Sequence, residues 1–207
     1  MIPSFYNDNQ YQNKEVVFLL EDYLINHCSP TLAGCKIGSL FTYRNNERKE
    51  INTYLIEWNK KLYGLGIFIT VLRKRKNSSL IYVYNKFNLE KLLKEEEVFS
   101  YLFSLGYLND NVDEVLLHLK KKLSDNKNVF PHEIGIFLGY PLCDVIGFIE
   151  NKGKSYKNCG KWKVYGCKRE SQILFDKYDY CKNCYKKMHS KGYDILEIIE
   201  KYKGEII

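Results

Sequence analysis

The chain has 207 residues, of which 45% are hydrophobic and 28% are charged, so it is apolar enough to fold around a core and is not a disordered chain. It carries a formal net charge of +7 and seven cysteines, an odd number that a fully paired disulfide framework does not explain. Because it has neither a secretion signal nor an apolar stretch of the roughly 20 residues that span a membrane, we expect a cytoplasmic protein without a membrane partner.

The first third of the chain is expected to be mainly helical. Residues 1–12 are polar and are expected to form a loose N-terminal segment ahead of a single domain, residues 13–207. Apolar residues at helical spacing predict one helix over residues 14–27 and a second over residues 46–63. The first helix is expected to end before Pro30, because proline disfavours helical geometry in the residue that precedes it.

A β-hairpin and further helices are expected next. Ile67–Leu72 and Leu80–Tyr84 are rich in β-branched and aromatic residues and flank a turn, which predicts two paired strands. Helical spacing resumes over residues 88–105, which we expect to form two helical segments. Another helix is expected over residues 111–124, where a polar residue precedes a regular apolar stripe.

The last third of the chain predicts helices on either side of a basic loop. The strongly apolar run 130–150 is expected to form two short helices separated by a turn at Gly139–Pro141. Trp162–Tyr165 is expected to be a short strand with Trp162 in the core, and residues 170–190 a long amphipathic helix. These elements predict an α+β fold, a single domain in which several helices cover a small, mainly antiparallel sheet.

The positive charge is concentrated in one segment. Residues 152–169 contain seven Lys or Arg and no Asp or Glu, so this segment accounts for the whole net charge of +7. Lys161 and Lys163 lie in it and are candidates for binding an anionic ligand. A second cluster, Arg73–Lys76, falls at the turn of the predicted hairpin. A solvated loop is the simpler explanation of such segments, since a nucleic-acid interface would need both clusters on one face.

Four cysteines in the last third of the chain allow a zinc site as an alternative. Cys181 and Cys184 are separated by two residues, as in many zinc sites and thiol–disulfide enzymes. Their partners would be Cys159 and Cys167, which are separated by seven residues, more than the usual two to four. Cys181 also lies on the apolar face of its predicted helix, where a thiol behaves as a small hydrophobic side chain. We therefore expect no metal at this set.

The segment between the first helix and the next strand contains further candidates, because such junctions often present side chains to a cleft. Cys28 is a candidate nucleophile if His27 or His132 lies near it in space. Thr31 and Lys36 are candidates for binding a ligand, Lys36 through an anionic group. The alternative is a purely structural turn in which the Cys28 thiol is buried.

The apolar run 130–150 contains three ionisable residues, His132, Glu133 and Asp144. Burying an ionised group costs free energy unless it is paired or hydrogen-bonded, so these residues belong either to a structural network or to a site. We take His132 and Glu133 as candidates for acid–base catalysis, and Asp144 with Tyr140 as candidates for binding a ligand. The alternative is a capped helix start, in which Glu133 faces the positive end of the helix dipole.

Four motifs occur together and in order along the chain. They are Cys28-Ser-Pro-Thr-Leu-Ala-Gly-x-Lys36-x-x-x-Leu40-Phe41, Leu80-Ile-Tyr-Val-Tyr84, Phe130-Pro-His-Glu-Ile-Gly-Ile-Phe-Leu-Gly-Tyr-Pro-x-x-Asp-Val-x-Gly-Phe-Ile149 and Gly160-x-Trp-Lys-Val-Tyr-Gly166. This combination resembles an uncharacterised bacterial family found in anaerobic Firmicutes, domain of unknown function 3793 (DUF3793). The resemblance implies a single-domain cytoplasmic protein, offers no catalytic residues to transfer, and associates the family with redox, iron or haem systems.

Three functions are consistent with the sequence. The first, which we prefer, is a binding or accessory protein that holds a small anionic or planar ligand in a cleft near Cys28–Lys36 and His132–Asp144. The second is an enzyme that uses the candidate nucleophile or the candidate acid–base pair, with the redox, iron or haem link that the resemblance implies. The third is a nucleic-acid-binding module that uses the basic segment 152–169, a partner that we do not expect. The sequence indicates no particular cofactor or oligomeric state.

Overall fold

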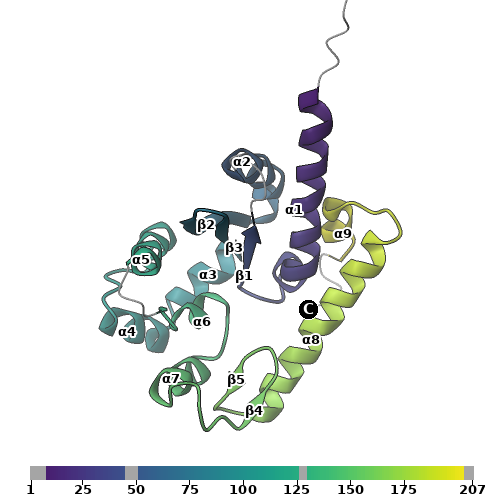
Figure 1. Ribbon diagram of the computed structural model, residues 1–207. Helices are drawn as coiled ribbons and strands as arrows, with labels where there is room; N and C mark the ends of the chain where they lie inside the picture. Colours follow the sequence, from purple (N-terminus) through teal and green to yellow (C-terminus); the bar gives the residue numbers. More distant parts are fainter. Residues whose placement is uncertain (1–7, 45–50, 126–129, 203–207) are drawn as a thin grey trace, which may run out of the picture.

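A three-stranded antiparallel sheet lies at the centre of the molecule, with helices around it (Figure 1). The computed structural model describes residues 8–44, 51–125 and 130–202. The strands lie in the order β1–β3–β2, with β1 at Gly38–Arg44, β2 at Ile67–Arg75 and β3 at Ser78–Asn85. Strands β2 and β3 are the predicted hairpin, and they pair antiparallel with a bulge between Val71 and Arg73.

Helices make up most of the rest of the described chain. They are α1 (Asp8–Leu32), α2 (Ile51–Leu62), the 3-10 helix η1 (Tyr63–Leu65), α3 (Lys86–Leu93), α4 (Glu96–Ser104), α5 (Val112–Ser124), α6 (Ile134–Phe137), α7 (Leu142–Glu150), α8 (Lys168–His189) and α9 (Ile195–Tyr202). Two short strands, β4 (Asn158–Cys159) and β5 (Lys163–Val164), pair between α7 and α8. None of the helices in the described ranges has the length and apolar character that crossing a membrane requires. The predicted single-domain α+β fold is confirmed.

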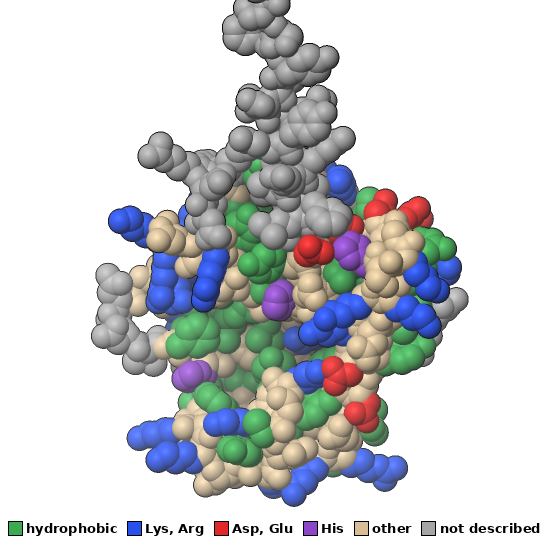
Figure 2. Space-filling view, turned by 45° about the vertical axis from the view of Figure 1, so that its right-hand side comes forward, with side chains coloured by type: hydrophobic (Ala, Val, Ile, Leu, Met, Phe, Trp, Pro, Cys, Tyr) green, Lys and Arg blue, Asp and Glu red, His purple; other side chains and the backbone are tan. Residues whose placement is uncertain are grey.

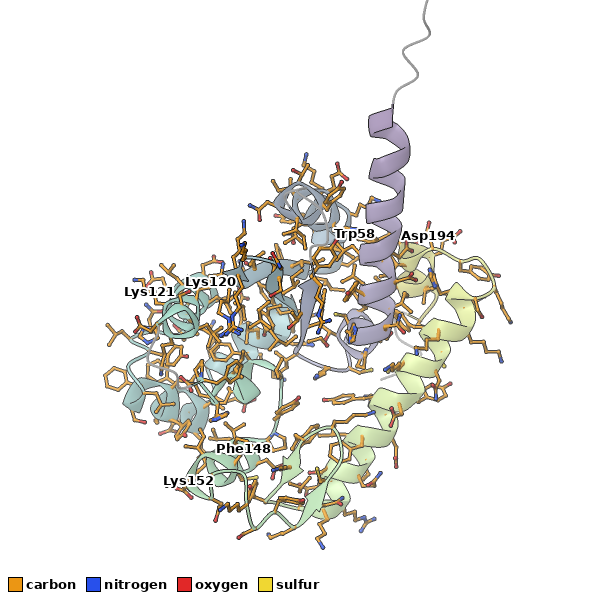
Figure 3. The ribbon with its side chains drawn as sticks, viewed as in Figure 1. Trp58, Lys120, Lys121, Phe148, Lys152 and Asp194 are labelled. Carbon is orange, nitrogen blue, oxygen red and sulfur yellow. The ribbon has the colours of Figure 1, made fainter. Side chains whose placement is uncertain are left out.

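Both faces of the sheet are buried, because successive side chains of a strand point to opposite sides. On β3, Ile81 and Val83 face a hydrophobic cluster formed with α1, α2, α8 and α9. Tyr82 and Tyr84 face a second cluster, which α3 to α7 complete. Trp58 of α2 lies between α2 and α1 in the first cluster (Figure 3) and is only 2% exposed.

The first helix is longer than predicted. It runs from Asp8, inside the segment expected to be loose, through Pro30 to Leu32. Proline lacks an amide hydrogen, but in the last turn this removes a single backbone hydrogen bond. The carbonyl of Pro30 then accepts hydrogen bonds from the amides of Cys35 and Lys36, at 2.9 and 3.0 Å, which closes the helix end. The prediction that this helix ends before Pro30 is therefore wrong, because the steric bias of proline is outweighed here by these contacts.

The C-terminal helix α9 was not predicted, although the sequence contains its start signal. Oδ1 of Asp194 (Figure 3) accepts hydrogen bonds from the amides of Leu196 and Glu197, and Oε2 of Glu197 accepts one from the amide of Asp194 at 2.9 Å. This reciprocal pair is a capping box. Ile198 and Ile199 then bury the inner face of α9 against α1 and α8 (Figure 1).

Tyr82 connects the sheet to the short helix α6. Its side chain is fully buried, and its hydroxyl donates a hydrogen bond to the carbonyl oxygen of Phe137 at 2.6 Å. Gly38 leaves the space for this contact, because a Cβ atom there would lie 2.4 Å from the Tyr82 ring and 2.6 Å from the Phe137 carbonyl oxygen. The contact fixes α6, and the chain that follows it, to the sheet.

The substitution Tyr82→Phe is expected to lower the free energy of unfolding by about 1–2 kcal/mol, because a buried carbonyl group loses its side-chain donor. Tyr84→Phe is the matched control on the same strand, since it removes a hydroxyl that makes no hydrogen bond with the described residues. Chemical denaturation of both variants measures the difference. Equal losses in the two variants would show that the Tyr82 hydrogen bond does not hold α6 in place.

Candidate functional site

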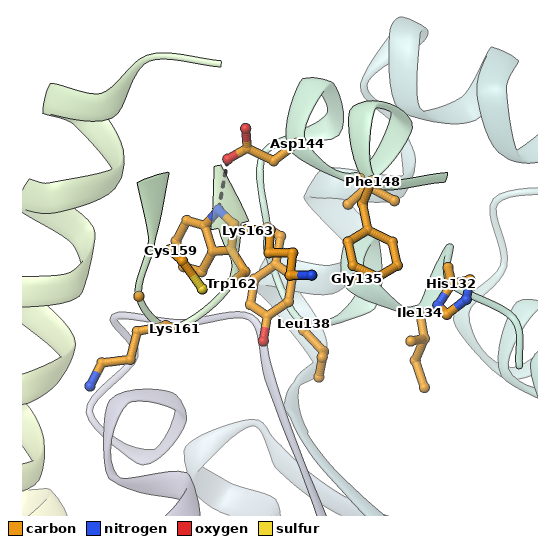
Figure 4. Close-up of a pocket in the computed structure, with 13 residues that line it drawn as sticks. His132, Ile134, Gly135, Leu138, Asp144, Phe148, Cys159, Lys161, Trp162 and Lys163 are labelled. Carbon is orange, nitrogen blue, oxygen red and sulfur yellow. Dashed lines mark hydrogen bonds between the residues drawn. The ribbon is translucent and has the colours of Figure 1, made fainter. Parts of the chain in front are cut away.

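A pocket of about 350 Å³ lies where α6 and α7 meet the loop that carries β4 and β5 (Figure 4). We call it the α7 pocket. Its walls are mainly apolar and aromatic, and its polar lining residues are His132, Asp144, Cys159, Lys161 and Lys163. Trp162 lies in the middle of the close-up, with His132 on one side and Lys161 on the other (Figure 4). The pocket thus brings together five residues that the sequence predicts as catalytic or ligand-binding candidates, namely His132, Tyr140, Asp144, Lys161 and Lys163.

The turn between α6 and α7 forms as the sequence predicts. Gly139 adopts a left-handed conformation with φ of 74°, which a glycine reaches without strain, and Pro141 then precedes the first turn of α7. Gly135 allows α6 to pack closely on α7, because a Cβ atom there would lie 2.9 Å from a methyl carbon of Val145. This tight corner places His132 and Asp144 on the same pocket.

The carboxylate of Asp144 is buried and fully engaged. Oδ2 accepts a hydrogen bond from the indole Nε1 of Trp162 at 2.7 Å (Figure 4), and Oδ1 accepts one from the amide of Tyr165 and one from the amide of Gly166, both at 2.7 Å. The residue is only 2% exposed. Asp144 therefore joins α7 to the β4–β5 loop, and its oxygens are already used within the protein.

Close backbone contacts support this junction. A Cβ atom on Gly147 of α7 would lie 2.5 Å from the ring of Tyr165, and one on Gly166 would lie 2.6 Å from the sulfur of Cys143. Larger residues at either position would push the loop away from the helix. The chain between α7 and β4 contains two left-handed residues other than glycine, Lys152 with φ of 51° and Ser155 with φ of 57°, a conformation that the surrounding contacts must hold in place.

The charged groups at the α7 pocket are cationic or are already paired. Lys161 forms an ion pair with Asp179 of α8. The ammonium of Lys163 donates a hydrogen bond to the carbonyl oxygen of Gly153 at 2.7 Å and lies 5.8 Å from the centre of the Phe148 ring. The His132 ring lies edge-on to the same ring, with 4.9 Å between their centres. Two lysines and a histidine therefore surround a mainly apolar hollow.

An aromatic wall separates the α7 pocket from the end of α1. The rings of Tyr140 and Trp162 stack at 4.6 Å between their centres. Behind them, the ammonium of Lys36 lies 5.4 Å from the Tyr140 ring and 5.7 Å from the Tyr178 ring. The pKa of Lys36 is lowered to about 8, mainly by burial; Cys28 opposes this shift and nearby Lys161 adds to it. Lys36 takes part in no ion pair among the described residues, so two tyrosine faces compensate for its lost hydration.

The structure separates Glu133 from His132. Glu133 is 5% exposed, and its Oε1 lies 2.5 Å from the ammonium of Lys122 on α5 and accepts a hydrogen bond from the hydroxyl of Tyr107 at 3.3 Å. His132 points to Phe148 and the pocket instead. Adjacent side chains point in different directions, so the expected acid–base pair is not formed, and Glu133 serves to hold α6 against α5.

The candidates at the end of α1 are also buried away from the α7 pocket. Cys28 is fully buried, and burial raises the pKa of its thiol well above the usual range. The hydroxyl of Thr31 is buried as well and shares a hydrogen bond of 2.8 Å with the hydroxyl of Ser39. Neither residue is part of the pocket lining. This geometry fits a structural turn with a buried Cys28 thiol better than it fits a catalytic nucleophile, which must be accessible.

The four cysteines considered as an alternative zinc site do not come together. Cys159 and Cys167 are exposed, whereas Cys181 is buried inside the contact between α8 and the end of α1. Cys184 is half-buried one turn further along α8. Within residues 8–44, 51–125 and 130–202, no group of three or more His, Cys, Asp or Glu side chains is placed to hold a metal ion.

The two basic clusters lie far apart. The β2–β3 hairpin that carries Arg73–Lys76 belongs to the central sheet, whereas the loop after α7 is at the lower end of the molecule (Figure 1). Figure 2 shows Lys and Arg side chains spread over several parts of the face in view. Several lysines of the basic segment also bind their own surroundings, as Lys157 does through the carbonyl oxygen of Gly166 at 3.2 Å. This arrangement does not form one continuous basic surface.

Phe148 is a pocket residue that the sequence analysis missed. It follows Asp144 by four residues on α7, and residues four apart lie on one face of a helix. That spacing could have identified it once Asp144 was taken as a site residue. Trp162, expected in the core, is 8% exposed and belongs both to a small hydrophobic cluster and to the pocket wall.

Comparison with known proteins adds a family and no activity. A family model described as "Protein of unknown function (DUF3793)" matches residues 24–199. No curated protein and no solved structure matches the chain.

We expect Asp144→Asn to lower the free energy of unfolding by about 2 kcal/mol, because an amide nitrogen replaces an acceptor that faces buried N–H donors. The melting temperature should fall by roughly 4–8 °C for a chain of this size. Asp176→Asn on the exposed side of α8 is the control and should change it little. An unchanged melting temperature in the first variant would refute the role assigned to Asp144.

Proposed function

The chain belongs to the DUF3793 family of proteins of unknown function, and we propose that it binds a small molecule with a flat apolar body and an anionic group in the α7 pocket. The observation that carries this proposal is the combination of aromatic walls with cationic side chains and no unpaired carboxylate. Ligand pockets are typically mainly apolar hollows of about 300–1,000 Å³ with a few polar groups, and this pocket has that character.

The apolar part of the ligand would lie against Phe148, Trp162 and Tyr140. The Tyr140 and Trp162 rings are stacked on each other, with 25° between their planes, so their orientation is fixed. A fixed aromatic wall of this kind favours a planar group, which can pack against the ring edges without ordering flexible side chains. Its stiffness comes from the hydrogen bond between Trp162 and Asp144.

The anionic part of the ligand would lie near Lys163 and His132. Lys163 has one hydrogen bond to a carbonyl oxygen and no carboxylate partner among the described ion pairs, so it can donate further hydrogen bonds. Lys161 is already paired with Asp179 and contributes less. A charge-assisted hydrogen bond from Lys163 would therefore distinguish an anion from a neutral molecule of the same shape.

Catalysis and nucleic-acid binding have less support. The thiol of Cys28 is buried and its pKa is raised, whereas a cysteine nucleophile needs to be an accessible thiolate. Glu133 is occupied by Lys122 and Tyr107. The two basic clusters lie apart, whereas nucleic-acid binding would need them on one face.

A pair of fluorescent probes of similar shape tests this function. We expect 8-anilinonaphthalene-1-sulfonate, a flat anion, to bind more tightly than the neutral N-phenyl-1-naphthylamine. Lys163→Met should weaken sulfonate binding by about five- to tenfold, through loss of one charge-assisted contact, and leave the neutral probe unchanged. Titration calorimetry measures both affinities.

Lys187→Met, at an exposed position of α8 remote from the pocket lining, is the matched control for the loss of one positive charge. The neutral probe reports whether the pocket of each variant is intact. The proposal fails if the wild-type protein binds the two probes equally, or if Lys163→Met and Lys187→Met weaken sulfonate binding to the same extent.

A further inference from the structure

Two cysteines that are distant in sequence meet at the contact between the end of α1 and α8. The sulfur of Cys181 lies 3.5 Å from the sulfur of Cys35 and donates a hydrogen bond to it. Cys35 lies in the turn between α1 and β1, and Cys181 in the middle of α8. We call these two residues the thiol pair. Cys184, which is closest to Cys181 in sequence, is not the residue whose sulfur lies against it.

The two thiols differ in environment. Cys181 is fully buried, whereas Cys35 is half-buried and therefore reaches the surface. Cys35 also packs against the small hydrophobic cluster of Trp162, Phe175 and Tyr178. This packing keeps Cys35 beside α8. One accessible thiol and one buried thiol in contact are the arrangement that a two-step exchange reaction needs.

We propose that the thiol pair is a site of thiol–disulfide exchange, at which a small-molecule disulfide such as glutathione disulfide converts Cys35 and Cys181 into an intramolecular disulfide. The two sulfurs must approach from 3.5 Å to the roughly 2.05 Å of a disulfide bond, a movement of about 1.5 Å. The reaction needs no ligand in the α7 pocket, so it stands or falls independently of the proposed function.

The reaction proceeds in two displacements. Cys35, as a thiolate, attacks one sulfur of the small disulfide, so that a mixed disulfide forms and one small thiolate leaves. This thiolate takes the proton of Cys181, whose sulfur then attacks the Cys35 sulfur and expels the second small thiolate, which takes up the proton that Cys35 had released. In total, two protein thiols are oxidised to one disulfide, and one small disulfide is reduced to two thiols.

The electrostatics assign these roles to the two cysteines. The hydrogen bond from Cys181 lowers the pKa of Cys35 to about 7, and nearby Lys177 lowers it as well, although partial burial opposes both effects. The same hydrogen bond and burial raise the pKa of Cys181. Cys35 is therefore the thiol that is ionised near neutral pH, and Cys181 stays protonated until the mixed disulfide has formed.

Peptide mapping of the full chain tests the proposal. The reduced protein is equilibrated at pH 7 in glutathione buffers of increasing oxidised fraction, the remaining thiols are blocked with N-ethylmaleimide, and the cross-linked peptides are identified by mass spectrometry. We expect two thiols to be lost together and one peptide to join Cys35 to Cys181. A bridge between Cys181 and Cys184, or oxidation of exposed cysteines alone, would overturn the proposal.

Three serine variants separate the roles. In Cys181→Ser, the glutathione adduct should remain on Cys35, because no second thiol displaces it. In Cys35→Ser, the buried Cys181 should stay unmodified. Cys184→Ser is the matched control on the same helix and should form the bridge as the wild-type protein does. If Cys184→Ser forms no bridge while Cys35→Ser joins Cys181 to Cys184, the exchange takes place at another pair and the proposal is overturned.

A measurement on the wild-type protein alone guards against variants that do not fold. The rate of alkylation by iodoacetamide is followed at each cysteine as a function of pH. Cys35 should react about three-fold faster than Cys143 at pH 7, with a midpoint near 7, because a larger thiolate fraction outweighs a lower intrinsic nucleophilicity. Partial burial of the thiol and nearby Asp144 raise the pKa of Cys143, although the residue as a whole is exposed. The midpoint of its alkylation should therefore lie at a higher pH than that of Cys35. Slower reaction at Cys35 than at Cys143 would contradict the proposal.

Discussion

The carboxylate of Asp144 is the contact on which the candidate site depends. Burying a carboxylate costs free energy unless its oxygens accept hydrogen bonds. Here the β4–β5 loop and the residues after it donate three, from one indole N–H and two backbone amides. These bonds also fix Trp162, against whose cluster both Tyr140 and Cys35 pack. A single side chain of α7 therefore determines the shape of the pocket wall and the surface on which the thiol pair rests.

The fold follows from local patterns wherever neighbouring residues decide the structure. The β2–β3 hairpin and α5 form where periodicity predicts them, because the turn and the apolar stripe of each lie within a few residues. The end of α1 does not lie where the sequence predicts it, since contacts beyond Pro30 outweigh the bias of proline. Helix α9 is the opposite case, because the capping box at Asp194 is a local sequence signal that was overlooked.

The candidate site could be predicted only in part, because its decisive contacts join distant segments. An ionisable residue in an apolar run indicated Asp144, but its three donors lie 18, 21 and 22 residues further along the chain. Glu133 and His132 are neighbours in sequence and still face different elements. Cys35 and Cys181 are separated by 146 positions, so spacing favoured Cys184 as the partner. Only the packing of α8 on α1 brings the two together.

The close contacts at Gly147 and Gly166 limit which substitutions the protein can accept during evolution. Each glycine meets a specific neighbour, Tyr165 in one case and Cys143 in the other, at a separation that no additional carbon fits. A relative with alanine at position 147 would have to carry a smaller or displaced residue at position 165. Covariation between these two columns, rather than invariance of either, is the evolutionary signature that the junction should leave.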